Sequence, residues 1–95
     1  MSISCERILS QLENKDLEIK ILQWFYQIGG VGIMHLFRDF RAQGVKVTLP
    51  ELKEALDDLE QIGLIRKTRL GRYSLTTVGE FFEVCVPPYP EGWPR

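Results

Sequence analysis

The run LEQIGLIRKTRLGRYSLTTVGEFF, residues 59–82, holds the end of one helix, a turn between two short strands and the start of another helix. Gly63 closes a helical pattern because glycine adopts the left-handed conformation after a last turn at the lowest cost, and Leu64 then packs back on the helix. A second glycine, Gly71, sits where two strands must reverse. The strand-forming residues around it are Ile65, Tyr73 and Leu75. The run therefore predicts a β-hairpin between two helices.

The helix that ends at Gly63 begins with the motif TLPE. The Thr48 hydroxyl can accept from the amide of Glu51 while the Glu51 carboxylate reaches back, which is a capping box, and Pro50 is tolerated in a first turn. Apolar residues then recur at the spacing of one buried helical face. They are Leu49, Leu52, Leu56, Leu59 and Ile62.

Further helices are predicted on both sides of this one. Helical spacing of apolar residues indicates helices over 16–28 and 33–43, and a shorter one over 6–12. The GGVG segment, residues 29–32, ends the first of these. After the hairpin, the motif TVGE at Thr77 to Glu80 predicts a cap for a short helix through Phe81, Phe82 and Val84, which Pro87-Pro88 stops. Arg38, Asp39 and Arg41 are expected to face outward.

Length and composition favour one small domain. The chain has 95 residues and a formal net charge of -1, with 44% hydrophobic residues and charges of both signs interspersed. We predict one domain over 1–86, with its core in 16–84, and a proline-rich and aromatic-rich tail over 87–95. The sequence contains neither an apolar run long enough for a membrane helix nor the apolar centre of a signal peptide at its start, which predicts a soluble, cytoplasmic protein without membrane contact.

The residues that could carry soft-ligand or nucleophilic chemistry are Cys5, Cys85 and His35. In a cytosolic protein free thiols are the default, and the spacing of these residues is not that of a metal-binding loop. His35 is interpreted as a half-buried helix residue. The GGVG segment lacks the lysine of a nucleotide-binding loop, and no nucleophile elbow is present. We therefore expect no metal, no cofactor and no catalytic residues, and hence a protein that is not an enzyme.

Four of the twelve Lys and Arg residues lie within seven positions of the hairpin. They are Arg66, Lys67, Arg69 and Arg72. Cations near an exposed turn can approach phosphates without being buried, and each phosphate neutralised releases condensed counterions. Arg69 and Arg72 flank the turn and are the strongest candidates for phosphate or minor-groove contacts. Side chains alternate along a strand, so the four need not share one partner.

The order helix, helix, capped helix, Gly-Leu-Ile, hairpin, helix resembles the winged helix-turn-helix domain, over residues 16–84. It is similar to small bacterial and archaeal regulators of the multiple-antibiotic-resistance and phenolic-acid-decarboxylase repressor types. The residues that carry this resemblance are Leu59, Gly63, Leu64, Ile65, Gly71, Tyr73, Leu75, Thr76 and Gly79. It implies an α+β fold, mainly helical, with a three-helix core, a hairpin called the wing and a short C-terminal helix.

In that superfamily the third helix usually enters the major groove of DNA, and the wing lies along the backbone or in the minor groove. The resemblance therefore implies a DNA-binding transcriptional regulator or accessory factor with double-stranded DNA as its partner. The wing would contribute Arg66, Lys67, Arg69 and Arg72. The helices would contribute Arg38, Arg41, Thr48, Lys53 and Gln61.

The charge of the third helix supports an alternative hypothesis. Its exposed side carries carboxylates, which repel phosphates and can accept only from cytosine amines among base edges. These residues are Glu51, Glu54, Asp57 and Asp58. A winged-helix module that binds another protein through this acidic face, and not DNA, stays open beside the DNA-binding hypothesis. A homodimer is a further hypothesis, motivated by apolar residues near both ends: Ile8, Leu9, Leu12, Tyr89 and Trp93.

Overall fold

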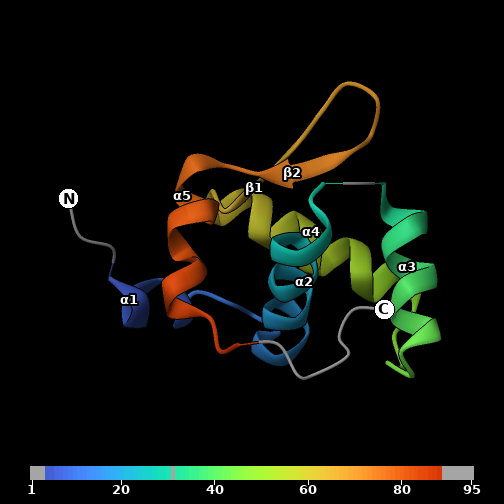
Figure 1. Cartoon of the computed structure of the whole chain (residues 1–95), viewed down its shortest axis with the longest axis horizontal. Helices are drawn as coiled ribbons and strands as arrows, with labels where there is room; N and C mark the ends of the chain where they lie inside the picture. Colours follow the sequence, from blue (N-terminus) through green and yellow to red (C-terminus); the bar gives the residue numbers. More distant parts are fainter. Residues whose placement is uncertain (1–3, 31, 89–95) are drawn as a thin grey trace.

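The computed structural model describes residues 4–30 and 32–88 of the chain. Over these residues the protein is rich in α-helix and has a two-stranded antiparallel sheet, which confirms the expected α+β class. The elements are α1 (Cys5–Leu9), α2 (Lys15–Ile28), α3 (Ile33–Ala42), α4 (Leu49–Ile62), β1 (Ile65–Lys67), β2 (Tyr73–Leu75), α5 (Thr77–Phe81) and the 3-10 helix η1 (Phe82–Cys85). Figure 1 shows α2 and α4 at the centre, α3 and α5 at opposite ends, and the hairpin above them. The predicted tail beyond residue 88 lies outside the described residues.

The capping box at the start of α4 is confirmed. The Thr48 hydroxyl oxygen accepts from the amide of Glu51 at 3.2 Å, and a carboxylate oxygen of Glu51 accepts from the amide of Thr48 at 2.9 Å. The helix ends at Gly63 with φ +96°, as predicted. Its buried face is narrower than the apolar pattern suggested, because Leu49 and Ile62 are only half-buried. The residues that fill the core from α4 are Leu52, Ala55, Leu56 and Leu59.

Trp24 lies at the centre of the core and is fully buried together with Phe40 and Phe82. Its indole N–H donates to a carboxylate oxygen of Asp39 at 2.8 Å. A buried indole needs such a partner, since an unpaired N–H would lose its hydrogen bond to water. The expectation that Asp39 faces outward with Arg38 and Arg41 is therefore wrong for Asp39, whose side chain is 25% exposed.

A dense set of hydrogen bonds joins the end of α4 to the start of α5. The Thr76 amide donates to the Leu64 carbonyl at 3.0 Å, and the Thr76 hydroxyl donates to the Gly63 carbonyl at 2.5 Å. The same hydroxyl accepts from the Gly79 amide at 3.0 Å. Thr76 is therefore the N-cap of α5, and the predicted cap at Thr77 is wrong by one residue. Thr76 takes this position because its hydroxyl can bond to Gly63 at the base of the hairpin and to Gly79 in the first turn of α5 at the same time.

Gly79 packs against this junction more closely than any other residue type could. A Cβ atom at Gly79 would overlap the Leu64 carbonyl oxygen. The Gly79 carbonyl also accepts from the Tyr26 hydroxyl at 2.6 Å, which attaches α2 to the same place. Leu75, Thr76 and Gly79 form a Leu-Thr-x-x-Gly pattern in the sequence. The glycine of this pattern thus has a steric basis in the contact between α5 and the end of α4.

The substitution Gly79→Ala tests this close approach. We expect it to lower the free energy of unfolding by about 2 kcal/mol or more, because the added methyl group forces the two backbones apart. Chemical denaturation measures the change. The matched control is Gly32→Ala, since Gly32 has φ -76° and open space around its position, and should lose only the preference of about 1 kcal/mol for glycine over alanine at an N-cap. Equal stability of the two variants would contradict the steric role of Gly79.

The GGVG segment does more than end α2. A Cβ at Gly30 would overlap the Tyr73 carbonyl oxygen, so this backbone runs directly against β2. Gly32 forms an isolated antiparallel bridge with Arg72 and then serves as the N-cap of α3 without a side-chain hydrogen bond. The segment between α2 and α3 thereby supports the second strand of the hairpin beside the tip.

The expectation of free thiols is wrong, because Cys5 and Cys85 form a disulfide with a Cα–Cα distance of 5.3 Å. It links the start of α1 to the end of η1 and leaves neither sulfur available as a ligand or nucleophile. Disulfides are typical of oxidising compartments, with intracellular proteins of hyperthermophiles as an exception. The cysteines therefore lend no support to the cytoplasmic expectation. None of the described helices has the length and hydropathy needed to cross a membrane.

The disulfide closes 80 residues of sequence and should stabilise the fold strongly. In the chain-entropy model a loop of this size is worth about 4.5 kcal/mol, and measured values are typically about 2–4 kcal/mol. We expect the double variant Cys5→Ser/Cys85→Ser to lose about this much free energy of unfolding under non-reducing conditions. The control is a thiol reductant added to both proteins, which should change only the wild type. An identical denaturation midpoint for oxidised and reduced wild type would contradict this expectation.

Candidate nucleic-acid interface

The tip of the hairpin is a tight turn and not a loose loop. The Thr68 amide donates to the Arg72 carbonyl at 2.7 Å, and the Gly71 amide donates to the Thr68 carbonyl at 3.1 Å. Gly71 has φ +75°, as the last residue of such a three-residue hairpin loop requires. Arg69 and Leu70 are then the two central residues of the turn. Both are exposed, as is Arg72.

The two remaining wing cations lie on opposite faces of β1. Arg66 pairs with Ser74 across the strands, and its Nε donates to the Ser74 hydroxyl at 3.4 Å. Lys67 pairs with Tyr73, and its ammonium lies 5.7 Å from the centre of the tyrosine ring. Alternation along the strand thus separates Arg66 from Lys67.

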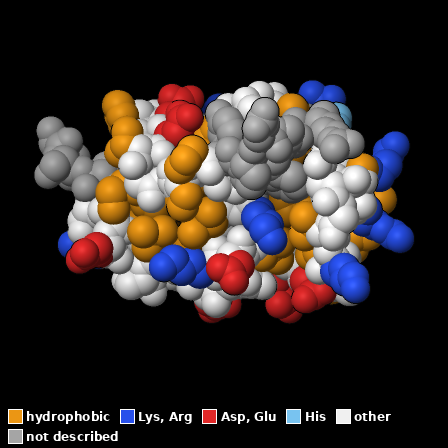
Figure 2. Space-filling model, turned by 60° about the horizontal axis from the view of Figure 1, so that its bottom comes forward, with side chains coloured by type: hydrophobic (Ala, Val, Ile, Leu, Met, Phe, Trp, Pro, Cys, Tyr) orange, Lys and Arg blue, Asp and Glu red, His pale blue; other side chains and the backbone are white. Residues whose placement is uncertain are grey.

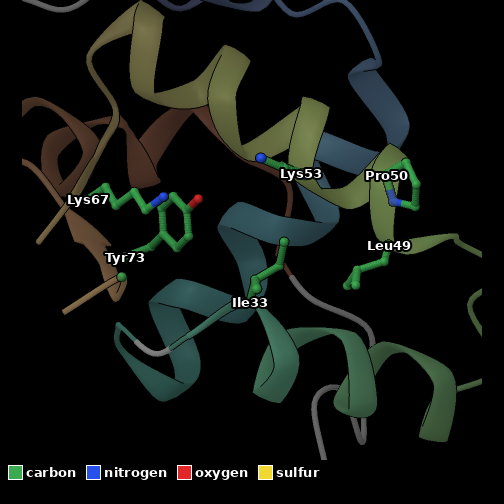
Figure 3. A pocket seen from close by; sticks show the side chains of 7 residues that line it. Ile33, Leu49, Pro50, Lys53, Lys67 and Tyr73 are labelled. Atoms are coloured by element: carbon green, nitrogen blue, oxygen red, sulfur yellow. The ribbon is translucent and has the colours of Figure 1, made fainter. Parts of the chain in front are cut away.

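An open groove of about 520 Å³ joins α4 to the hairpin. Its lining comes from the start of α3, the first turns of α4 and the hairpin: Ile33, Leu49, Pro50, Lys53, Lys67, Gly71 and Tyr73. Figure 3 shows Lys67 lying along the Tyr73 ring, across the groove from Leu49 and Pro50. The groove therefore has an apolar floor and an ammonium group from each side, Lys53 from α4 and Lys67 from β1.

A second open groove of about 530 Å³ follows the connection between α3 and α4. Arg41 and Lys46 line it together with Thr48, and the Arg41 guanidinium lies 5.7 Å from the centre of the Phe37 ring. Arg38 is exposed on α3. Figure 2 shows Lys and Arg side chains gathered at the α3 end of the molecule, on the right as in Figure 1. Lys46 did not stand out in the sequence because it lies between two helices and outside the hairpin.

Two of the residues implied by the resemblance are placed less favourably for a nucleic acid. The Thr48 hydroxyl already accepts from Glu51 and also donates to its carboxylate at 2.8 Å, so the capping box occupies it. Gln61 is exposed but lies eight residues after Lys53 in α4. At the rise of an α-helix this separation is about 12 Å along the axis. Neither residue is brought into the groove between α4 and the hairpin.

The four carboxylates of the predicted acidic face have different surroundings. Glu51 is held in the capping box, which lowers the pKa of its carboxyl through hydrogen bonds from Thr48. Asp58 is half-buried and accepts from the Glu13 amide at 3.2 Å. Glu54 and Asp57 are exposed. The structure thus divides the predicted face into two residues with intramolecular hydrogen bonds and two that point to solvent.

The acidic charge of α4 extends to the edge of the groove. Burial raises the pKa of the Tyr73 hydroxyl, and the carboxylates of Asp57 and Glu60 raise it further. Tyr73 therefore stays neutral and can act as a hydrogen-bond donor at neutral pH. A phosphate entering the groove would meet Lys53 and Lys67.

His35 is not the half-buried residue that was expected, because its side chain is 55% exposed. Its Nε2 lies 3.5 Å from the Asp39 carboxylate, one helical turn away. The described residues contain no group of three or more His, Cys, Asp or Glu side chains placed to hold a metal.

Glu18 of α2 is a buried acid that no sequence motif singles out. Its side chain is fully buried, and its Oε2 accepts from the Asn14 amide at 2.8 Å. Burial raises the pKa of Glu18 to about 8, and the neighbouring Asp58 contributes to the rise. Glu18 is therefore protonated at neutral pH.

The raised pKa gives stability a specific pH dependence. Unfolded Glu18 loses its proton near pH 4.5, whereas the folded protein keeps it until about pH 8. Its contribution is therefore complete below about pH 4.5 and is lost as the pH rises through 8. We expect the stability of Glu18→Gln relative to the wild type to rise by about 4 kcal/mol between pH 5 and pH 9.

Chemical denaturation at pH 5, 7 and 9 measures this difference. The exposed Glu54→Gln variant is the matched control and should track the wild type at all three values. A Glu18→Gln variant that follows the wild type across this range would show that Glu18 ionises in the folded protein as it does in the unfolded chain.

Comparison with protein-family models, with curated proteins and with solved structures gave no significant match to this chain. Its function is therefore inferred from the geometry and charge described above.

Proposed function

We propose that this protein is a winged-helix protein that binds double-stranded DNA and acts as a transcriptional regulator or accessory factor. The observation that carries the proposal is the groove in which Lys53 of α4 and Lys67 of the hairpin face one space beside the turn bearing Arg69 and Arg72. The order of elements, with the bridge of Gly32 to Arg72 beside the hairpin, is compatible with a winged helix. In this proposal α4 is the recognition helix and residues 65–75 form the wing.

In this proposal the cations of the hairpin and of α3 bind mainly to the phosphates of the DNA backbone. Arg69 and Arg72 are exposed on a turn that its own hydrogen bonds hold rigid, so they can reach a DNA backbone with little loss of conformational freedom. Lys46 and Arg41 extend the positive charge along the connection between α3 and α4. Each phosphate they neutralise releases counterions, which makes binding strongly dependent on salt.

The carboxylates of α4 limit how closely this helix can enter a groove of DNA. Glu54 and Asp57 are exposed and repel phosphates, while Glu51 and Asp58 have hydrogen bonds within the protein. This distribution of charge suits a binding mode in which the wing and the lysines of the groove provide the affinity. In this mode α4 enters the groove of DNA only to a shallow depth. This mode favours backbone contacts over base contacts, and hence modest sequence specificity.

Replacing two wing cations tests the proposal. The assay is a gel-shift titration on a mixed-sequence duplex at several salt concentrations. We expect Arg69→Ala/Arg72→Ala to weaken binding and to reduce the slope of log Kd against log salt by about 2. The reason is that each arginine that no longer neutralises a phosphate lowers the slope by roughly one unit. The matched control is Lys15→Ala/Lys20→Ala, which removes the same charge from exposed positions of α2. Equal slopes for the two double variants would exclude the wing from the interface.

Charge reversal on α4 gives an independent reading in the same assay. Glu54→Lys/Asp57→Lys should strengthen binding to any duplex, because the repulsion between α4 and the phosphates becomes attraction. Absence of wild-type binding at low salt would overturn the proposed function.

A protein partner for the acidic side of α4 is the second candidate function. The observation that favours it is the exposed pair of carboxylates at Glu54 and Asp57, which could face a basic surface. Because Asp58 is half-buried and accepts from the Glu13 amide, the available face is smaller than the sequence suggested. This candidate becomes the better one if the wild type fails to bind duplex.

A homodimer has less support than the sequence suggested. Leu12 is buried, and Ile8 and Leu9 pack against the core of the same chain, so these residues do not form a free surface. Tyr89 and Trp93 lie outside the described residues. The exposed apolar residues near the C-terminal end are instead Val78, Phe81 and Val84. A dimer formed through this end would use these, and sedimentation at micromolar concentration measures whether one forms.

A further inference from the structure

The hairpin tip carries an apolar side chain that phosphate binding by the wing does not involve. Leu70 is 86% exposed at the second central position of the turn. A single exposed leucine on a protein surface is ordinary. This one is held at the end of a projecting hairpin, where Figure 1 shows the loop extending away from the helices.

The turn fixes the direction in which Leu70 projects. Thr68 makes three hydrogen bonds across the turn: its amide donates to the Arg72 carbonyl, its carbonyl accepts from Gly71, and its hydroxyl accepts from the Arg72 amide at 3.3 Å. The positive φ of Gly71 completes the loop. A side chain on such a turn loses little backbone entropy on insertion into a partner.

The neighbours of Leu70 indicate what kind of partner it meets. Arg69 precedes it, Arg72 follows the glycine, and the segment 66–72 contains no carboxylate. An apolar side chain between two guanidinium groups suits a polyanion that has an apolar interior. The stacked bases of DNA beneath the minor groove fit this description, since arginine is drawn to the potential of a narrow minor groove and apolar wedges unstack base steps there.

We propose that Leu70 is an apolar wedge that enters a base step from the minor groove and bends the DNA, with Arg69 and Arg72 on the adjacent phosphates. This inference rests on the proposed function and adds a shape-dependent component to it. Flexible pyrimidine–purine steps, such as TA, cost least to open and are the preferred site of insertion. The protein would then select DNA sequences by how easily the duplex deforms. This selection compensates for the few base contacts that the acidic α4 can make.

The test measures bending separately from affinity. A duplex of about 30 base pairs with a central TA step carries a donor and an acceptor fluorophore at its ends, and energy transfer reports its bend when protein is saturating. We expect the wild type to bend this duplex by an angle within the range of about 20–90° found for apolar wedges. The Leu70→Ala variant should lose more than half of the bend and keep the wild-type salt slope, since no charge changes.

Two further variants control the result. Val84→Ala removes an apolar side chain of almost the same exposure, 87%, in η1 at the far end of the molecule, and should bend DNA like the wild type (Figure 1). Leu70→Met keeps an apolar side chain of similar size and should retain the bend. Because Leu70 is so exposed, its replacement should leave folding intact.

The outcomes separate the inference from the function beneath it. Wild-type binding without bending, or an unchanged bend in Leu70→Ala, would overturn the wedge and leave DNA binding in place. A wild type that fails to bind the duplex at low salt would overturn the proposed function and the wedge together.

Discussion

The contact between Thr76 and the end of α4 holds the rest of the structure in place. One hydroxyl donates to the Gly63 carbonyl and accepts from the Gly79 amide, while the amide of the same residue donates to Leu64. These bonds join the two ends of the hairpin, so the hairpin leaves the helical body at a fixed point. The close packing of Gly79 on Leu64 and the hydrogen bond from Tyr26 attach α5 and α2 to that point. The position of the basic tip relative to α4 follows from this junction.

The charge of the molecule is arranged around that geometry. The hairpin brings Lys67 to face Lys53 across a groove, and the α3 to α4 connection adds Arg41 and Lys46. The carboxylates of α4 interrupt this positive region. A nearly neutral chain can therefore present a cationic edge, because cations of the hairpin and of the α3 to α4 connection gather there, while exposed carboxylates lie along α4. A polyanion that follows the hairpin and the α3 end, with limited contact to the middle of α4, fits this arrangement best.

The disulfide and a buried acid contribute to the stability of the fold. The disulfide attaches α1 to η1, and Ile8 and Leu9 of α1 pack against the core. The buried acid of Glu18 lies at the contact of α2 with α4 and makes part of this stability dependent on pH. In Figure 1 α1 lies on the opposite side of the molecule from the tip of the hairpin.

The sequence by itself determined the order and bounds of most elements, since capping boxes, glycine stops and the spacing of apolar residues are local signals. The Thr48 box, the Gly63 stop and the hairpin around Gly71 are of this kind. Tertiary structure decided what depends on residues distant in sequence. The bond between Cys5 and Cys85, the burial of Glu18 and the hydrogen bond of Trp24 to Asp39 are examples. The same reason applies to the candidate site: the cations could be named from the sequence, but the groove that brings Lys53 to Lys67 exists only because the hairpin folds back beside α4.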